Sequence, residues 1–205
     1  MKKFSNTYIF LYVTALVLII AVVLSVVSIG LKPRQEANKQ AEKSQQILKA
    51  AGYNNVERSK AIALFESVAK KQENTANREM YTIQCADGSK GLVVALSGKG
   101  LWGAIWGYAV LSEDQSTIKG VTFSHKSETP GLGAKITEDS FAKSFVGKKL
   151  YDKDGKFVSV RVVPKGKGES IAAENRVDAI SGATITSRGV DKMMQELRIE
   201  KRDER

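Results

Sequence analysis

The stretch that decides the fold is Asp178-Ala179-Ile180-Ser181-Gly182-Ala183-Thr184-Ile185-Thr186-Ser187. It is a turn of small and polar residues, and an amphipathic helix follows it, because apolar residues recur at helical spacing at Val190, Met193, Met194 and Leu197. Ser, Thr and Gly are typical of a helix N-terminus, so we expect the helix to begin at Thr186 or Ser187. A helix N-terminus offers unpaired N–H groups to a phosphate. The stretch is therefore either an ordinary cap or an anion site, and it matches no phosphate-loop template.

The composition excludes several classes of function. The chain has 205 residues, which leaves room for one domain of ordinary size, and its formal net charge is +10. Its basic residues are scattered among acidic ones, with no recognition-helix or zinc-finger pattern, so nucleic-acid binding is not predicted. Cys85 is the only cysteine and His125 the only histidine. The chain can therefore form neither an internal disulfide nor a Cys/His metal cluster, and we predict no metal site.

The N-terminal part of the chain predicts a membrane anchor. From Tyr8 to Leu31 there is no charged residue, and Leu, Val, Ile and Ala dominate. A helix of this length can cross a bilayer core of roughly 30 Å. The alternative is a cleaved signal peptide, but such apolar regions are typically about 7–15 residues long and end in a small-x-small site. Ser28-Ile29-Gly30 fits that site only weakly, so a retained anchor over residues 1–32 is favoured.

The orientation of this anchor is nearly balanced by charge. Lys2 and Lys3 precede the apolar run, and Lys32 and Arg34 follow it. The free α-amino group favours an N-terminus on the cytoplasmic side. The rest of the chain is then expected on the periplasmic side of a bacterial inner membrane.

The region after the anchor is expected to be helical and then to form an antiparallel meander. Lys32–Lys49 is predicted as a helix that continues or restarts after Pro33 and stops at Gly52, and Ala61–Val68 as a short amphipathic helix. We assign residues 33–75 to a stalk with packing helices. Short β-like runs separated by turn residues follow, at Met80–Cys85, Gly91–Ser97, Ile105–Ser112 and Ile118–Ser124.

The C-terminal half mixes loops, helices and one more strand. The loop His125–Gly133 precedes a helix expected from about Glu138, and Lys156–Val163 is predicted as a strand. A second loop, Pro164–Gly168, leads to the opening stretch and the terminal helix. The domain is expected to cover residues 76–200, with a charged tail at 201–205 that frays.

Three loops other than the opening stretch could form a binding site. Gly98–Gly103 combines three glycines with Trp102, which can supply a flat apolar wall. In Glu128–Gly133, Pro130 stiffens the loop, the glycines let backbone N–H groups converge, and Leu132 is free to pack on a ring. In Lys165–Gly168 the lysines can screen an anion. The alternatives are a hairpin turn with Trp102 in the core, a rigid turn between strand and helix, and solvated surface lysines; for the first and third loops the sequence by itself favours these plain interpretations.

Hydrolytic catalysis is not predicted. No Ser–His–Asp arrangement surrounds His125, and no nucleophile elbow is present. We expect His125 to be a hydrogen-bonded structural residue and Cys85 a small buried apolar one. No catalytic residue is assigned.

Taken together, these motifs resemble the membrane-anchored FMN-binding domains. The run from Asp178 to Thr184 resembles their flavinylation motif, Asp-x-x-(Ser/Thr)-Gly-Ala-Thr, without departure. Gly100–Gly103, His125–Gly133 and Ser181–Ser187, in that order after one N-terminal span, are similar to the family of C subunits of the sodium-translocating NADH:quinone (ubiquinone) oxidoreductases. The resemblance covers the whole chain, although the chain is shorter than the better-known members.

The resemblance implies an α+β fold, with a single N-terminal transmembrane helix followed by one FMN-binding domain whose antiparallel sheet is flanked by helices. It implies an electron-transfer subunit with FMN on Thr184 through a phosphodiester, a phosphoprotein linkage installed from FAD by a flavin transferase. Its other partners are the remaining subunits of the complex and the membrane. The implied cofactor-binding residues are Thr184, Ser181, Gly182, Ala183, Asp178, Glu128, Thr129, Gly131, Leu132, Gly133, Trp102 and Lys165.

Two alternatives stay open at this point. The G subunit of the Rnf ferredoxin:NAD⁺ complexes shares the motif and the architecture, and Leu101-Trp102 favours the sodium-translocating family over it. A non-redox extracytoplasmic binding module would explain the anchor and the basic charge, with Ser181–Thr184 as a plain cap.

Overall fold

The structure is a computed structural model that describes residues 5–72 and 78–198. The chain divides into two compact units, Met1–Ala41 and Glu42–Arg205, and each is described by itself. The basic start at Lys2 and Lys3 and the charged tail at 201–205 lie outside the described residues.

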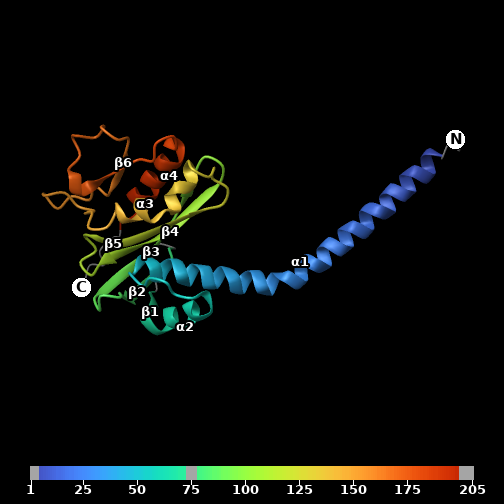
Figure 1. Ribbon diagram of the computed structural model, residues 1–205, viewed down its shortest axis with the longest axis horizontal. Helices are drawn as coiled ribbons and strands as arrows, with labels where there is room; N and C mark the ends of the chain where they lie inside the picture. Colours follow the sequence, from blue (N-terminus) through green and yellow to red (C-terminus); the bar gives the residue numbers. More distant parts are fainter. Residues whose placement is uncertain (1–4, 73–77, 199–205) are drawn as a thin grey trace, which may run out of the picture. The chain divides into compact units, whose positions relative to one another are not determined.

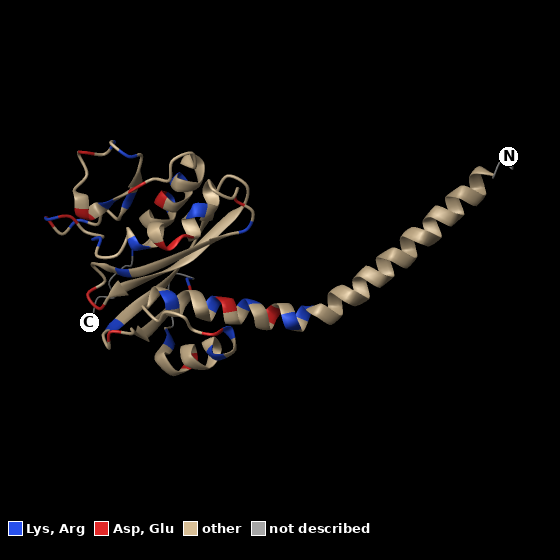
Figure 2. Cartoon of the chain, viewed as in Figure 1, with Lys and Arg blue, Asp and Glu red and all other residues tan. Residues whose placement is uncertain are grey.

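The first unit consists of most of one long helix. Helix α1 (Asn6–Ala50) is continuous over 45 residues and runs through Pro33, so the chain needs no restart there. The part of α1 before Lys32 carries no charged residue (Figure 2). By length and composition it is apolar and long enough to cross a membrane. The helix expected over Tyr8–Leu31 is therefore confirmed.

The second unit is built on an antiparallel sheet, as predicted. Its five strands lie in the order β1-β2-β3-β4-β5, so each strand pairs with its sequence neighbour. The strands are rich in β-branched and aromatic residues, and turn residues separate one strand from the next. The bounds are β1 (Ala69–Gln72), β2 (Met80–Gln84), β3 (Lys90–Lys99), β4 (Ala104–Ser112) and β5 (Ile118–His125). Strand β1 was not predicted; it follows directly on α2 (Arg58–Val68).

Helices cover both faces of this sheet (Figure 1). On one face lie the last turns of α1 and helix α2, and their core includes Ile47, Leu48 and Ala61 against Val93 and Val110. The other face carries the C-terminal half of the chain. Since both faces are covered, the central strands are buried on both sides and read as continuous apolar runs.

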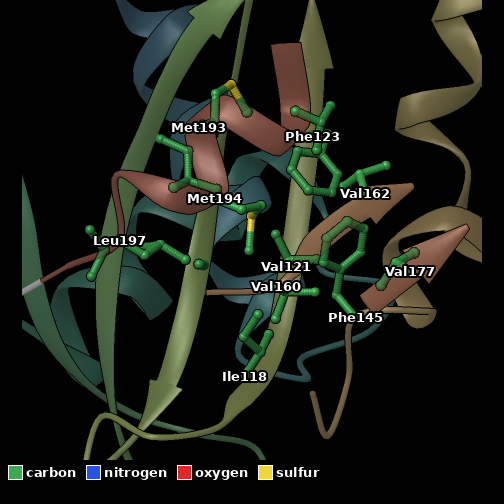
Figure 3. Packing of buried hydrophobic residues seen from close by; sticks show 14 of the residues in the cluster. Ile118, Val121, Phe123, Phe145, Val160, Val162, Val177, Met193, Met194 and Leu197 are labelled. Atoms are coloured by element: carbon green, nitrogen blue, oxygen red, sulfur yellow. The ribbon is translucent and has the colours of Figure 1, made fainter. Parts of the chain in front are cut away.

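The second core holds the C-terminal helix against the sheet. Met193 and Met194 of α4 share one core cluster with Val121 and Phe123 of β5 (Figure 3), and Met193 packs against Gly98 of β3. Phe145 is fully buried in the same cluster. This packing fixes one face of the terminal helix, so its opposite face is left for solvent.

The C-terminal half differs from the prediction in its shorter elements. These elements are η1 (Gly133–Thr137), α3 (Asp139–Lys143), β6 (Arg161–Val163), η2 (Ala173–Asn175), β7 (Arg176–Asp178) and α4 (Thr184–Gln195). The strand predicted over Lys156–Val163 is wrong in extent, because only its last three residues pair, in parallel, with β7. The terminal helix begins at Thr184, not at Thr186 or Ser187, because the Ser187 N–H already bonds the Ala183 carbonyl at 2.9 Å.

Candidate functional site

The carboxylate of Glu128, in the loop after β5, binds both the turn that holds Trp102 and the start of α4. Its Oε1 accepts a hydrogen bond from the backbone N–H of Trp102 at 2.9 Å. Its Oε2 accepts one from the hydroxyl of Thr186 at 2.6 Å. Glu128 is only 4% exposed. The β3–β4 turn, the loop after β5 and the start of α4 therefore meet at one buried side chain.

Two glycines make room for this carboxylate. A Cβ on Gly100 would lie 2.5 Å from Glu128 Oε1. A Cβ on Gly133 would overlap Glu128 Oε2 and lie 2.8 Å from the Thr186 hydroxyl. No larger residue fits at either position without displacing the carboxylate.

The surroundings keep Glu128 ionised at neutral pH. Burial by itself raises the pKa of this carboxyl group, but the hydrogen bonds from Thr186 and Trp102 favour the charged form. The net result is a pKa below the ordinary value for glutamate. The centre of the site therefore holds a negative charge with donors on both oxygens.

Thr184 is the first residue of α4 and its side chain is exposed. It lines a cavity of about 800 Å³ together with Ser181, Gly182 and Lys165. Arg161, Arg188 and Lys192 also line this cavity, and Asp191 is its one acidic residue. Arg161 is paired with Asp191 at 3.0 Å. The other three cations form no salt bridge with a described residue, so the cavity is suited to an anion.

Exposed apolar side chains gather around the same helix start. Trp102 is 65% exposed, Ile185 52%, Leu101 47% and Leu132 43%. A Cβ on Gly182 would lie 2.9 Å from Leu132, so the loop after β5 touches the turn before α4. Leu101 and Ile185 line a further cavity of about 520 Å³, on the side of α4 where Lys99 lies. Exposed apolar groups beside a cationic cavity are typical of a site for a ligand with a flat ring and an anionic group.

The remaining predicted residues lie outside the cavity that Thr184 lines. Asp178 ends β7 and lines a neighbouring cavity, which does not include Thr184. Ala183 is buried behind the helix start. Thr129 is exposed, and its carbonyl accepts from the N–H groups of Leu132 and Ala134, both at 3.1 Å. Gly131, with φ of 75°, forms the exposed tip of that turn.

The two single residues behave as expected. His125 Nδ1 accepts a hydrogen bond from the Glu128 N–H at 3.2 Å, which braces the loop after β5. The hydrogen bond expected for His125 is therefore present. Cys85 is buried in the core beside α2, and burial raises the pKa of its thiol. The thiol is therefore an inert apolar group.

Sequence reasoning missed the role of Thr186. The residue was included in the opening stretch, but no partner was assigned to it. Its position gives a partial signal, because residues two apart on a helix point about 200° away from each other. If Thr184 faces solvent, Thr186 must face the interior and needs a polar partner there.

Comparisons with known proteins point to one group. Residues 100–198 match the family model described as the FMN-binding domain. The chain is 31% identical to the C subunit of the Na(+)-translocating NADH-quinone reductase of Haemophilus ducreyi, over 87% of this chain and 84% of the relative. It is also 31% identical to the protein of that name from Neisseria meningitidis serogroup B, over 92% of this chain and 87% of the relative.

A solved structure has the same fold. The crystal structure of the C subunit of the Na(+)-translocating NADH-quinone reductase from Parabacteroides distasonis superimposes with a TM-score of 0.72 at 37% identity. The superposition covers 81% of this chain and 92% of that chain.

Proposed function

The chain belongs to the family of C subunits of the Na⁺-translocating NADH-quinone reductases, and from this we propose that it is an electron-transfer subunit carrying FMN covalently on Thr184. The bond is a phosphodiester to the threonine Oγ. A flavin transferase installs it, because a threonine hydroxyl is a poor nucleophile without activation.

The observation that carries this proposal is the place of Thr184. Its hydroxyl is exposed at the first turn of α4 and opens onto the cationic cavity of about 800 Å³. Within the described part of the α4 N-terminus, Thr186 and Ser187 are buried, and their hydroxyls are already bonded to Glu128 and to the Ile180 N–H. Thr184 is thus the α4 hydroxyl that a transferase can reach.

The charges around the cavity suit a phosphodiester. Arg188 lies one helical turn beyond Thr184, on the same face of α4. Lys165 reaches the cavity from the loop after β6. Together with the N–H groups at the start of α4, they stabilise one negative charge in partly solvated surroundings.

The apolar groups suit the ring system. Trp102 and Leu132 supply flat or branched apolar surface that solvent otherwise covers. Backbone groups of Glu128–Gly133 border the same region. Bound FMN would accept and pass on electrons, while the protein orients the ring and sets its surroundings.

The rest of the chain fits a membrane-bound complex. We propose that the apolar part of α1 spans the bacterial inner membrane once, that Glu42–Arg205 lies on the periplasmic side, and that other subunits of the reductase pass electrons to and from this domain. A covalent link keeps the cofactor on the protein outside the cytoplasm.

The test is the covalent flavin itself. The full chain is produced together with a flavin transferase, denatured, and examined by in-gel flavin fluorescence and intact mass. Wild type is expected to fluoresce and to carry the mass of FMN less water. Thr184→Val keeps the branched shape and removes the hydroxyl, so it is expected to lose both signals.

The matched control is Thr137→Val. Thr137 is another exposed threonine of the domain, and its hydroxyl bonds the Ala134 carbonyl of its own turn, at 2.9 Å. It should keep the covalent flavin. Flavin that persists in Thr184→Val would move the attachment to another residue, and a wild-type chain without added mass would refute the cofactor proposal.

A further inference from the structure

The buried carboxylate of Glu128 lies where three segments distant in the sequence come together. Trp102 precedes it by 26 residues and Thr186 follows it by 58. Both donate to the carboxylate, each to a different oxygen. A side chain that is held at both oxygens and 4% exposed joins its partners rigidly.

The hydrogen bond to Glu128 holds the backbone of Trp102, whose side chain lies outside the hydrophobic core. The indole of Trp102 is 65% exposed, so core packing fixes it only in part. Its backbone is fixed by two interactions, the bond from its N–H to Glu128 and the turn closed by the Gly100 N–H on the Gly103 carbonyl at 2.8 Å. The position of the apolar wall therefore depends on Glu128.

The bond to Thr186 holds the first turn of α4 against the loop after β5. Residues two apart on a helix point in nearly opposite directions. With the Thr186 hydroxyl bound to Glu128 Oε2 at 2.6 Å, the Thr184 hydroxyl must face out into the cationic cavity. Gly133 leaves the space that this bond occupies.

We propose that Glu128 is a positioning residue that holds the turn of Trp102 and the first turn of α4 in one fixed arrangement, so that it sets where the flavin ring lies. Its negative charge also makes the addition of an electron to that ring less favourable. The effect on the flavin rests on the proposed function, whereas the effect on Trp102 does not.

The experiment uses the full chain purified in detergent, produced without the flavin transferase for the first measurement and with it for the second. Trp106→Phe is introduced throughout, because the chain has 2 tryptophans and Trp102 then becomes the only one. The variants are Glu128→Ala, Glu128→Gln and Thr186→Val. Glu113→Gln is the control, since it removes a carboxylate charge from the exposed β4–β5 turn. Cooperative thermal unfolding establishes that each variant is folded.

The first measurement is the fluorescence anisotropy of Trp102 in the chain without flavin, because a flavin beside the indole would quench its emission. Glu128→Ala is expected to lower it, because the Trp102 N–H loses its acceptor. Glu128→Gln should retain it, since a Gln amide can accept from Trp102 and donate to the Thr186 hydroxyl. Unchanged anisotropy in folded Glu128→Ala would overturn the proposal. If Glu128→Ala does not fold, Thr186→Val takes its place. The carboxylate is then held at one oxygen only, so the anisotropy of Trp102 is expected to fall. An unchanged anisotropy would overturn the proposal.

The second measurement is the midpoint potential of the bound flavin. Glu128→Gln is expected to shift it to a more positive value, since the shape is kept and the charge is lost, and Glu113→Gln is expected to leave it unchanged. Equal potentials in wild type and Glu128→Gln would overturn the electrostatic part. A wild-type chain without flavin would refute the proposed function, and the anisotropy would still decide on the positioning role.

Discussion

At the scale of single residues, the site depends on two threonine hydroxyls with opposite surroundings. Thr184 is exposed on the cavity, and Thr186 is 1% exposed and bound to Glu128. The helical repeat alone separates them, because a shift of two residues turns a side chain to the other face. One hydroxyl is therefore available for chemistry and the other for structure.

Removing the buried hydroxyl should destabilise the domain. Thr186→Val keeps the shape of the side chain but leaves Glu128 Oε2 without its donor. The expected cost is about 1–3 kcal/mol in the free energy of unfolding, since a buried charged oxygen loses its partner. Urea unfolding of the full chain in detergent measures it. Thr137→Val should stay within about 0.5 kcal/mol of wild type, and an equal loss in both variants would contradict the prediction.

The same carboxylate predicts a pH dependence. The pKa of Glu128 is below its ordinary value in the folded chain. Its stabilising contribution is therefore complete above the unfolded pKa of about 4.3 and is lost as the pH falls toward the folded pKa. Between pH 7 and pH 3, the melting temperature of wild type should fall relative to that of Glu128→Gln, mainly below about pH 4.3. A constant difference across this range would rule out a role for the charge.

At the scale of elements, Asp191 joins α4 to β6. Its carboxylate accepts from the Val162 N–H at 2.8 Å, from Arg161 Nε at 3.0 Å and from Gln195 at 2.6 Å. Strand β6 has only three residues and pairs with the equally short β7. These few ladder bonds need the additional anchor on the helix.

Asp191→Ala should release this edge of the domain. The Val162 N–H and the Arg161 guanidinium both lose their acceptor, which we expect to cost about 1.5–3 kcal/mol, the range for a hydrogen bond to a charged group. Urea unfolding measures the loss, and hydrogen exchange at the Val162 amide should become faster. Asp154→Ala, in an exposed turn, is the control and should change neither quantity. Unchanged exchange at Val162 in Asp191→Ala would show that the short strands hold without the anchor.

The same elements show what the sequence can and cannot predict. Strands β2 to β5 could be predicted because each is a β-rich run closed by turn residues. The extent of β6 and the existence of β7 could not be predicted, because three residues carry no period and the parallel pairing of the two strands depends on residues 15 apart, such as Arg161 and Arg176. The bond between Glu128 and Thr186 was missed for a similar reason: it spans 58 residues, and local patterns do not encode it.

At the scale of the whole molecule, the fold brings some of the residues grouped in the sequence analysis to one cavity and leaves others out. Ser181, Gly182 and Thr184 of the motif line one cavity, and Lys165 lines it from another loop. Asp178 does not line it, although the motif includes it. A motif records which residues act together, whereas only the fold shows which of them face the same space.

The charges that flank the apolar segment are nearly balanced, so they do not decide on which side of the membrane the domain lies. A cysteine-labelling experiment can decide it. Cys85 is buried and is the only cysteine, so Cys85→Ala gives a background without thiols. In it, Asp154→Cys marks an exposed turn of the domain, and Ser5→Cys marks the residue before α1. A single helix that crosses the bilayer puts these two sites on opposite sides.

A membrane-impermeant maleimide, added to cells with a permeabilised outer membrane, should label Asp154→Cys at once and Ser5→Cys only after lysis. The reverse pattern would place the domain in the cytoplasm. A mature chain without the Ser5→Cys site would show instead that the apolar segment is a cleaved signal.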